Sequence, residues 1–180
     1  MSRIVLSEFL SLDGVMETPE SWVFPYMNKD IQKFKLDEAL AAGSLLLGYH
    51  TYQIFAASWP SRSDPDGFAD KMNGMPKYVL SSTSEKLAWN NSHVLNGGSA
   101  EGAVASLKQQ PGQDLLVTGS GFLVQLLMRF NLIDEYRILI FPITLGKGKR
   151  LFNEGQPAEL KLTEAKAFDT GVILLRYEKC

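Results

Sequence analysis

Cysteine, histidine and net charge are all scarce in this chain of 180 residues. Cys180 is the only cysteine and there are two histidines, which excludes an intrachain disulfide and leaves no spacing typical of a metal site. The 18 basic side chains nearly balance the 20 acidic ones, and a net charge of −2 creates no field that would attract nucleic acid or anionic lipid. We therefore expect no metal, nucleic-acid or membrane partner.

Long hydrophobic runs are missing as well. Glu8 and Asp13 interrupt the apolar start of the chain before the core of a signal peptide could form, and no apolar run approaches the roughly 20 residues that cross a membrane. Hydrophobic residues still make up 45% of the chain, enough to bury a sizeable core. We expect a single soluble domain over residues 1–180, located in the cytoplasm.

Apolar strands and amphipathic helices alternate along most of the chain. The patterns predict strands at 3–12, 44–48, 77–81, 93–95 and 114–118, helices at 28–42, 51–58, 99–109 and 122–130, and final strands at 135–143, 160–168 and 172–178. This order predicts a three-layer α/β/α fold, with a mostly parallel open sheet, helices on both faces and antiparallel C-terminal strands.

The turn Gly119-Ser120-Gly121 joins a buried strand to the clearest amphipathic helix. Glycine lets the backbone approach a ligand closely, and the helix N-terminus offers free N–H groups, so this turn can hold a phosphate. A tight strand-to-helix turn also needs glycine for its own geometry, and this alternative stays open on the residues alone.

Two more strand ends carry hydrogen-bond donors. Gly48-Tyr49-His50-Thr51-Tyr52 and Ser81-Ser82-Thr83 each follow a predicted strand directly. Either segment alone is explained by a helix cap or a turn. Ligands of open parallel sheets bind beyond the carboxyl ends of the strands, so together these segments predict one elongated cleft along that edge.

Asp30 begins the predicted helix that carries Phe34. A carboxylate held beside aromatic rings can have a raised pKa and act as an acid near neutral pH. The alternative is that Asp30 only stabilises the helix N-terminus, where acidic side chains are favourable. Trp22 could wall a pocket for a flat ring or could belong to the core. The basic loop Gly146-Lys147-Gly148-Lys149-Arg150 fits either an anion site or a solvated turn.

Several of these segments, in this order, resemble the dihydrofolate-reductase-like superfamily and, within it, the riboflavin-biosynthesis reductase branch of RibD C-terminal domains. Ser11-Leu12-Asp13-Gly14 resembles the first-strand signature of that branch. The segment 141–152 resembles its Pro-x-x-Leu-Gly-x-Gly-x-x-Leu-Phe motif. The segments 46–52 and 117–121 are similar to the Gly-Arg-x-Thr segment and the Gly-Gly pyrophosphate turn, and 79–82 is similar to the strand end that meets the adenosine 2′-phosphate.

The resemblance implies an NADPH-dependent reductase that transfers a hydride to a small heterocyclic substrate, similar to 5-amino-6-(5-phosphoribosylamino)uracil reductase. The implied cofactor-binding residues are Gly14, Gly48, Tyr49, Thr51, Ser81, Ser82, Gly119, Ser120, Gly121, Phe122 and Leu123. Dihydrofolate reduction is the alternative within enzymes. A nucleotide-binding protein without catalysis is the alternative from another class.

The resemblance also assigns catalytic and substrate-binding residues. Asp30 and Asp13 are the catalytic candidates, and Trp22 and Phe34 are the candidates for binding substrate. Tyr49 stands where the family has a phosphate-gripping Arg, which leaves NADH open as an alternative cofactor, and Ser120 replaces a glycine of the pyrophosphate turn. Members of this branch are commonly dimers, so we expect a homodimer.

Overall fold

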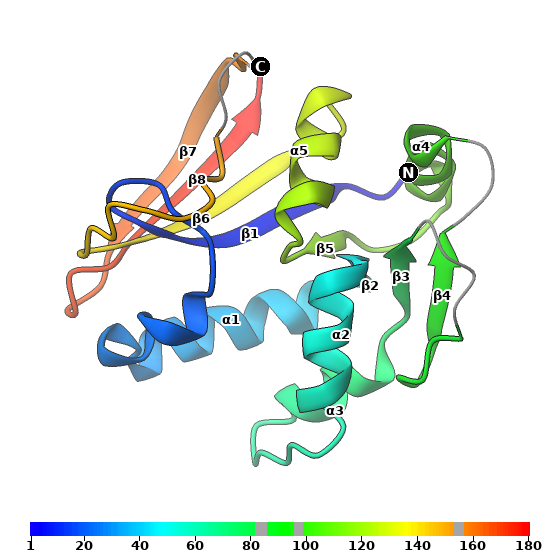
Figure 1. Cartoon of the computed structure of the whole chain (residues 1–180), viewed down its shortest axis with the longest axis horizontal. Helices are drawn as coiled ribbons and strands as arrows, with labels where there is room; N and C mark the ends of the chain where they lie inside the picture. Colours follow the sequence, from blue (N-terminus) through cyan, green and yellow to red (C-terminus); the bar gives the residue numbers. More distant parts are fainter. Residues whose placement is uncertain (82–85, 96–98, 153–156) are drawn as a thin grey trace.

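The computed structural model describes residues 1–81, 86–95, 99–152 and 157–180. Its strands form one mixed sheet in the order β4-β3-β2-β5-β1-β6-β8-β7 (Figure 1). They are β1 (Ile4–Ser11), β2 (Ser44–Gly48), β3 (Lys77–Leu80), β4 (Ser92–Leu95), β5 (Leu115–Val117), β6 (Glu135–Phe141), β7 (Leu160–Ala167) and β8 (Ile173–Lys179). Neighbours from β4 to β6 are parallel, whereas β8 is antiparallel to both β6 and β7. The predicted mostly parallel sheet with antiparallel C-terminal strands is confirmed.

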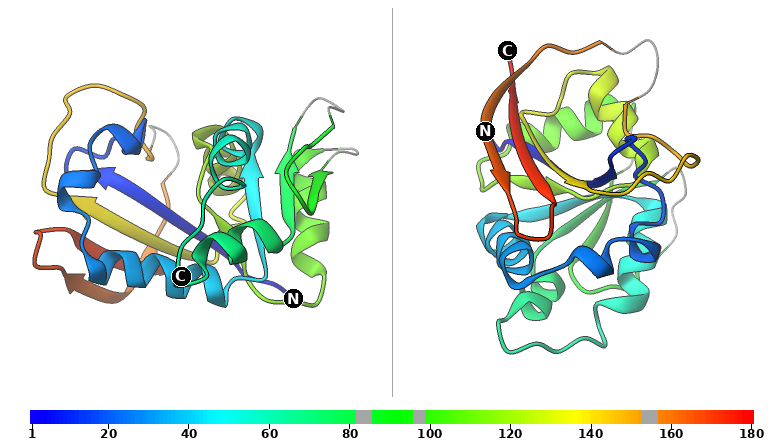
Figure 2. Two further views of the ribbon diagram at one scale, coloured as in Figure 1. Left: turned by 90° about the horizontal axis from the view of Figure 1, so that it is seen from below. Right: turned by 90° about the vertical axis from the view of Figure 1, so that its left-hand side faces the viewer.

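Helices cover both faces of this sheet (Figures 1 and 2). They are α1 (Lys29–Ala41), α2 (Tyr49–Ser58), α3 (Phe68–Gly74), α4 (Ala100–Gln109) and α5 (Gly121–Arg129), with short 3₁₀ turns at Pro19–Ser21 and Phe24–Tyr26. The first three lie on one face and the last two on the other, which confirms the three-layer arrangement. Within the described ranges no helix is long and apolar enough to span a membrane.

The hydrophobic core divides at the sheet. Leu6, Leu46 and Val117 contribute to the cluster under α4 and α5, while the helices on the other face cover a second and a third cluster. Every residue of β2 and β5 is buried, as expected for parallel strands covered on both sides. In α5, Leu123, Val124 and Leu127 are buried against this core, whereas Phe122 in the first turn is 76% exposed.

The order of strands reverses beside β1. The chain runs outward from β2 to β4, and then returns to place β5 between β2 and β1 and β6 on the far side of β1. The pairing of β1 with β5 ends at Leu6 and Val117, whereas the pairing of β1 with β6 continues as far as Ser11. β1 and β5 therefore separate at their carboxyl ends, and ligands of open α/β sheets bind at such a reversal.

Candidate active site

Two glycine turns contact each other at the carboxyl edge of the sheet. Gly48 ends β2, and its N–H donates to the carbonyl oxygen of Gly119 at 3.2 Å. Ser120 lies so close that a Cβ on Gly48 would overlap its Oγ. Gly119 has φ +102, the peptide bond to Ser120 is cis, and a Cβ at Gly119 would lie 2.8 Å from Oγ1 of Thr51. The predicted phosphate segments of β2 and β5 are thus brought together, and neither glycine leaves room for a side chain.

The helices that start at these turns, α2 and α5, have unusual N-termini. Neither has a side-chain cap, and neither carries an acidic residue in its first turn. By contrast, backbone N–H groups in the first turns of α1, α3 and α4 donate to the side-chain oxygens of Asn28, Asp64 and Ser99 respectively, and each of these helices has an acidic residue in its first turn. Free N–H groups and the helix dipole favour an anion, so the edge shared by α2 and α5 is suited to phosphate groups.

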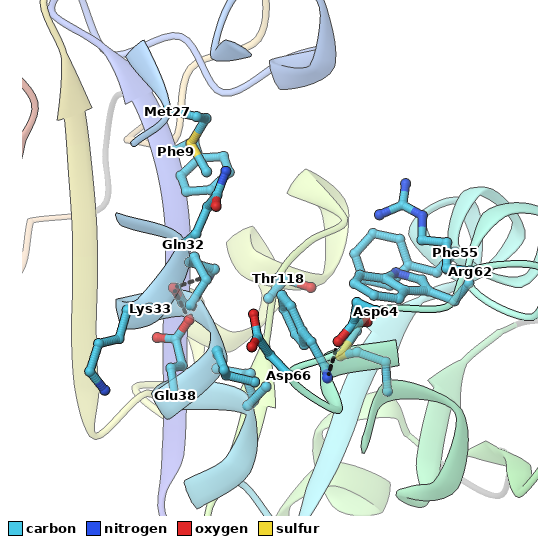
Figure 3. Close-up of a pocket in the computed structure, with 18 of the residues that line it drawn as sticks. Phe9, Met27, Gln32, Lys33, Glu38, Phe55, Arg62, Asp64, Asp66 and Thr118 are labelled. Carbon is cyan, nitrogen blue, oxygen red and sulfur yellow. Dashed lines mark hydrogen bonds and ion pairs between the residues drawn. The ribbon is translucent and has the colours of Figure 1, made fainter. Parts of the chain in front are cut away.

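A cavity of about 1290 Å³ opens at the carboxyl end of β5, where Thr118 lines it directly before Gly119. Gly48, Gly119 and Ser120 are not part of the lining. Figure 3 shows Phe9 and Gln32 on one side of this cavity, Phe55 and Arg62 on the other, and Thr118 between them. The lining comes from β1, α1, the carboxyl end of β5, and the segment from α2 to α3. The cavity therefore occupies the crevice where β1 and β5 separate.

Glu8 of β1 lines this cavity and is only 9% exposed. Its Oε1 has no hydrogen-bond partner among the described residues, and the same holds for Oγ1 of Thr118. Burial raises the pKa of Glu8 from its ordinary value of 4.5 to about 8; the nearby Lys35 lowers that pKa and Glu38 raises it. The crevice thus holds a carboxyl group that is largely uncharged at neutral pH.

The charged groups next to Glu8 are paired with one another. Lys35 Nζ lies 2.5 Å from Oε2 of Glu38 and donates to Oγ of Ser7 at 2.8 Å. Glu38 also accepts from Ser7 at 2.9 Å and from Arg137 at 3.4 Å. This network satisfies the carboxylate of Glu38 but leaves Oε1 of Glu8 without a partner in the part of the chain that the structure describes.

The structure places the candidate catalytic residue Asp30 and the candidate substrate-binding residues Trp22 and Phe34 in different surroundings. Asp30 is exposed and lines the cavity. Phe34 is not part of the lining; its ring lies 5.4 Å from the guanidinium of Arg176 and packs on the core between α1 and β8. Trp22 is buried edge-on against Phe141, at 5.5 Å, and its Nε1 donates to the backbone. Of these three residues, only Asp30 borders the cavity.

Asp13 fastens the loop before β7 to the end of β1. Its carboxylate accepts hydrogen bonds from Ser11 Oγ at 2.6 Å and from the backbone N–H groups of Leu145 and Gly146 at 3.1 and 2.8 Å. These bonds, that from Ser11 foremost, lower the pKa of Asp13 to about 2. Asp13 is absent from the cavity lining, and its substrate contact stays a prediction. Gly14, at φ +83, accepts from Leu151 N–H and holds the same loop.

The remaining cofactor candidates lie along the same edge. Tyr49, in place of the family Arg, stacks on Tyr52 with ring centres 6.3 Å apart. Leu123 is fully buried, so it can offer a ligand only its backbone. Ser81 follows β3 directly, and Ser82 lies outside the described residues.

Sequence reasoning missed Glu8 and Thr118. A signal for Glu8 is visible in the sequence, because it places an acidic residue within the apolar run of a strand that is buried on both faces. Thr118 gives no such signal, since a threonine at a strand end is ordinary.

The strand order, the crevice at its reversal and the paired glycine turns define a dihydrofolate-reductase-like α/β protein. More narrowly, the chain belongs to the RibD C-terminal domain family, whose family model matches residues 2–174. Both the fold and the family inferred from the motifs are confirmed.

Relatives of known sequence or structure match nearly the whole chain. The uncharacterized protein YyaP of Bacillus subtilis (strain 168) is 28% identical over 97% of this chain and 94% of its own length. YwjB of the same organism is 26% identical over 96% of this chain and 95% of its own.

Two solved structures share the fold. One is a Shewanella sp. PV-4 protein whose name places it provisionally in riboflavin biosynthesis, with a TM-score of 0.76, 20% identity, and coverage of 100% of this chain and 99% of that one. The other is a pyrimidine reductase-like protein from Corynebacterium diphtheriae, with a TM-score of 0.72, 11% identity, and coverage of 99% and 92%.

Proposed function

We propose that this chain is a reductase that uses NADPH to transfer a hydride to a small heterocyclic substrate. The observation that carries the proposal is the pair of uncapped helix N-termini, at α2 and α5, that meet beside the cavity. Membership of a riboflavin-biosynthesis-reductase-like family supports it.

The residues at the two turns fit the diphosphate of a dinucleotide. The first turn of α5 after Ser120 offers backbone N–H groups to one phosphate, and the first turn of α2, with the hydroxyl of Thr51, offers donors beside it. Ser81 lies farther along the edge, at the end of β3, where an adenosine phosphate would reach. NADH is the alternative cofactor, because Tyr49 offers no positive charge for a 2′-phosphate. When bound, the nicotinamide supplies the hydride.

The cavity suits a flat, partly polar substrate. Phe9, Phe55 and Trp59 are among its lining residues, and Asp30 of α1 and Arg62 after α2 add charges of opposite sign. A heterocycle held there lies next to the turn at Gly119, so the protein can orient it toward the cofactor. A reaction similar to that of 5-amino-6-(5-phosphoribosylamino)uracil reductase is the first to test.

Two other functions have specific support. Asp30 borders the cavity, which favours dihydrofolate reduction. The ring of Tyr49 at the place of the family Arg favours a nucleotide-binding protein without catalysis. Both alternatives use the same proposed nucleotide-binding edge, at the N-termini of α2 and α5.

We also propose a homodimer. Leu162 and Ile173, on the C-terminal β-hairpin, are 50% and 41% exposed, and apolar side chains on an edge hairpin are favourable when a second copy covers them. Light scattering on the purified chain would give twice the monomer mass, and a monomer mass at all concentrations would refute this.

An absorbance screen tests the reductase proposal. The protein is mixed with NADPH or NADH and a panel of pterins and aminopyrimidines, including ribosylated uracils, and loss of the reduced-nicotinamide band is followed. We expect oxidation with one substrate class. Turnover on dihydrofolate that Asp30→Asn abolishes would establish the first alternative. Tight cofactor binding with no oxidation across the panel would establish the second.

A further inference from the structure

Glu8 lies between the two halves of the proposed site. Its Oε1 is 3.8 Å from the position that a Cβ on Gly119 would take, so the carboxyl borders the turn assigned to the cofactor. Glu8 is also among the residues that line the cavity assigned to the substrate. Because β1 and β5 stop pairing at Leu6 and Val117, no strand neighbour covers Glu8 on the β5 side. A group placed here can reach a substrate atom beside the carbon that receives the hydride.

Nothing in the described protein uses this carboxyl. Buried polar groups are nearly always hydrogen-bonded, and an unpartnered buried carboxylate is costly. The nearest cation, Lys35, is already paired with Glu38 and Ser7. An apolar residue at position 8 would continue the hydrophobic pattern of β1. Buried polar groups that lower stability, as the carboxyl of Glu8 does, are concentrated at functional sites. A protonated Glu8 would offer a ligand an O–H donor at the edge of the cavity.

We propose that Glu8 is the proton donor of the reductase, and this rests on the proposed function. As a hydride adds to the electrophilic carbon of a C=N or C=O group, the π bond breaks toward the heteroatom, which takes the proton of the Glu8 carboxyl. The substrate thereby gains one hydride, which a bound reduced nicotinamide would supply, and one proton from Glu8. The Glu8 carboxylate then takes a proton back from solvent. Thr118, with an unpartnered Oγ1 in the same crevice, is suited to hold the substrate heteroatom.

The electrostatic surroundings of Glu8 favour this role over one for Asp30. From α1, Lys35 and Glu38 act on Glu8 in opposite directions, and the burial effect exceeds both, so the carboxyl keeps its proton near neutral pH. The other charged side chains of the cavity are Lys29, Asp30, Lys33, Arg62, Asp64 and Asp66, on its two walls. Asp30, by contrast, is exposed in the first turn of α1, so no such burial surrounds its carboxyl group.

The substitution Glu8→Gln tests the inference, because it keeps the shape of the side chain and removes the acid. Glu101→Gln, an exposed glutamate on α4, is the matched control. With the substrate found in the screen, Glu8→Gln is expected to lower the rate of hydride transfer about 10²- to 10⁴-fold and to leave NADPH affinity within about twofold. Wild type and Glu101→Gln should lose activity as the pH rises through about 8, where Glu8 loses its proton.

A second readout does not depend on turnover. The infrared C=O stretch of a protonated carboxylic acid should be present in the free wild-type protein at pH 7, disappear as the pH rises above about 8, and be absent from Glu8→Gln at pH 7 and above. No such band, or one that Glu8→Gln leaves in place, overturns the inference. It is also overturned if Glu8→Gln transfers hydride at the wild-type rate, or if Asp30→Asn alone removes the alkaline loss of activity. In both cases the enzyme is still a reductase. Absence of NADPH oxidation by wild type refutes the proposed function itself, and the proton transfer with it.

Discussion

The N–H of Gly48 donates to the carbonyl oxygen of Gly119 at 3.2 Å and joins the carboxyl ends of β2 and β5. This bond extends the parallel pairing of β2 with β5, which brings the N-termini of α2 and α5 together at the sheet edge although the two turns lie far apart in the sequence. The side chain of Ser120 fills the space next to Gly48. The proposed diphosphate site therefore depends on how closely these two turns approach each other.

Gly48→Ala tests this close approach. The backbone of Gly48, at φ −73 and ψ 152, tolerates any residue, so the only obstacle to alanine is overlap of its Cβ with Ser120. We expect a loss of about 1–3 kcal/mol in the free energy of unfolding, measured by urea denaturation. Gly74→Ala, at the end of α3 with no atom near the added Cβ, should be neutral or stabilising.

A double variant checks the cause of that loss. Adding Ser120→Gly to Gly48→Ala removes the overlapping Oγ, and it should recover a substantial part of the lost stability. Strictly additive effects would contradict the contact between the two turns.

The fold could be predicted from the sequence because its signals are local. The buried strands β2 and β5 consist almost entirely of apolar residues, and the glycines after them mark where each helix begins. The helix α3 was missed, since it is short and its N-terminus is capped from the preceding loop by Asp64. A cap outside the helical segment gives no periodic pattern.

The site was only partly predictable, because its details depend on contacts between distant segments. Helical spacing put Asp30 and Phe34 on one helix, but which of them borders the cavity depends on how α1 packs against β8. The state of Glu8 likewise depends on Lys35 being engaged by Glu38, a pairing that the sequence does not specify.

The buried carboxyl of Glu8 should make stability depend on pH. Its pKa is raised from 4.5 to about 8 in the folded protein, so the unfolded chain releases this proton at lower pH and the folded state loses relative stability as the pH rises between those values. Glu8→Gln removes this loss. At pH 9 the variant should be about 1–3 kcal/mol more stable, or roughly 2–10 °C higher in Tm, and the difference should shrink toward pH 5. Parallel Tm curves across this range would contradict the raised pKa.

Asp13 should control the loop that it holds. Asp13→Ala removes the acceptor of the N–H groups of Leu145 and Gly146, so hydrogen exchange at these two amides should quicken by about tenfold or more. In wild type the pKa of Asp13 is lowered to about 2, so its contribution is present above its ordinary value of 3.8 and lost as the pH falls through 2. Asp37→Ala, an exposed carboxylate on α1, should leave both amides unchanged.

Ser120→Asp should separate helix stability from phosphate binding. Aspartate is a good N-cap residue, so α5 should be as stable as before, but its negative charge would repel a phosphate at the helix N-terminus. We expect NADPH affinity to fall by about tenfold or more with little change in Tm. Ser99→Asp makes the same exchange at the N-cap of α4 and should leave affinity unchanged. Unchanged affinity in Ser120→Asp would place the cofactor elsewhere.

Titration calorimetry of NADPH, and separately of NADH, into the folded wild-type protein tests whether the edge shared by α2 and α5 binds a reduced nicotinamide dinucleotide. We expect saturable binding of one NADPH per chain, with affinity lost in Ser120→Asp and kept in Ser99→Asp. No saturable heat with either cofactor, from a protein whose cooperative unfolding shows that it is folded, would contradict it.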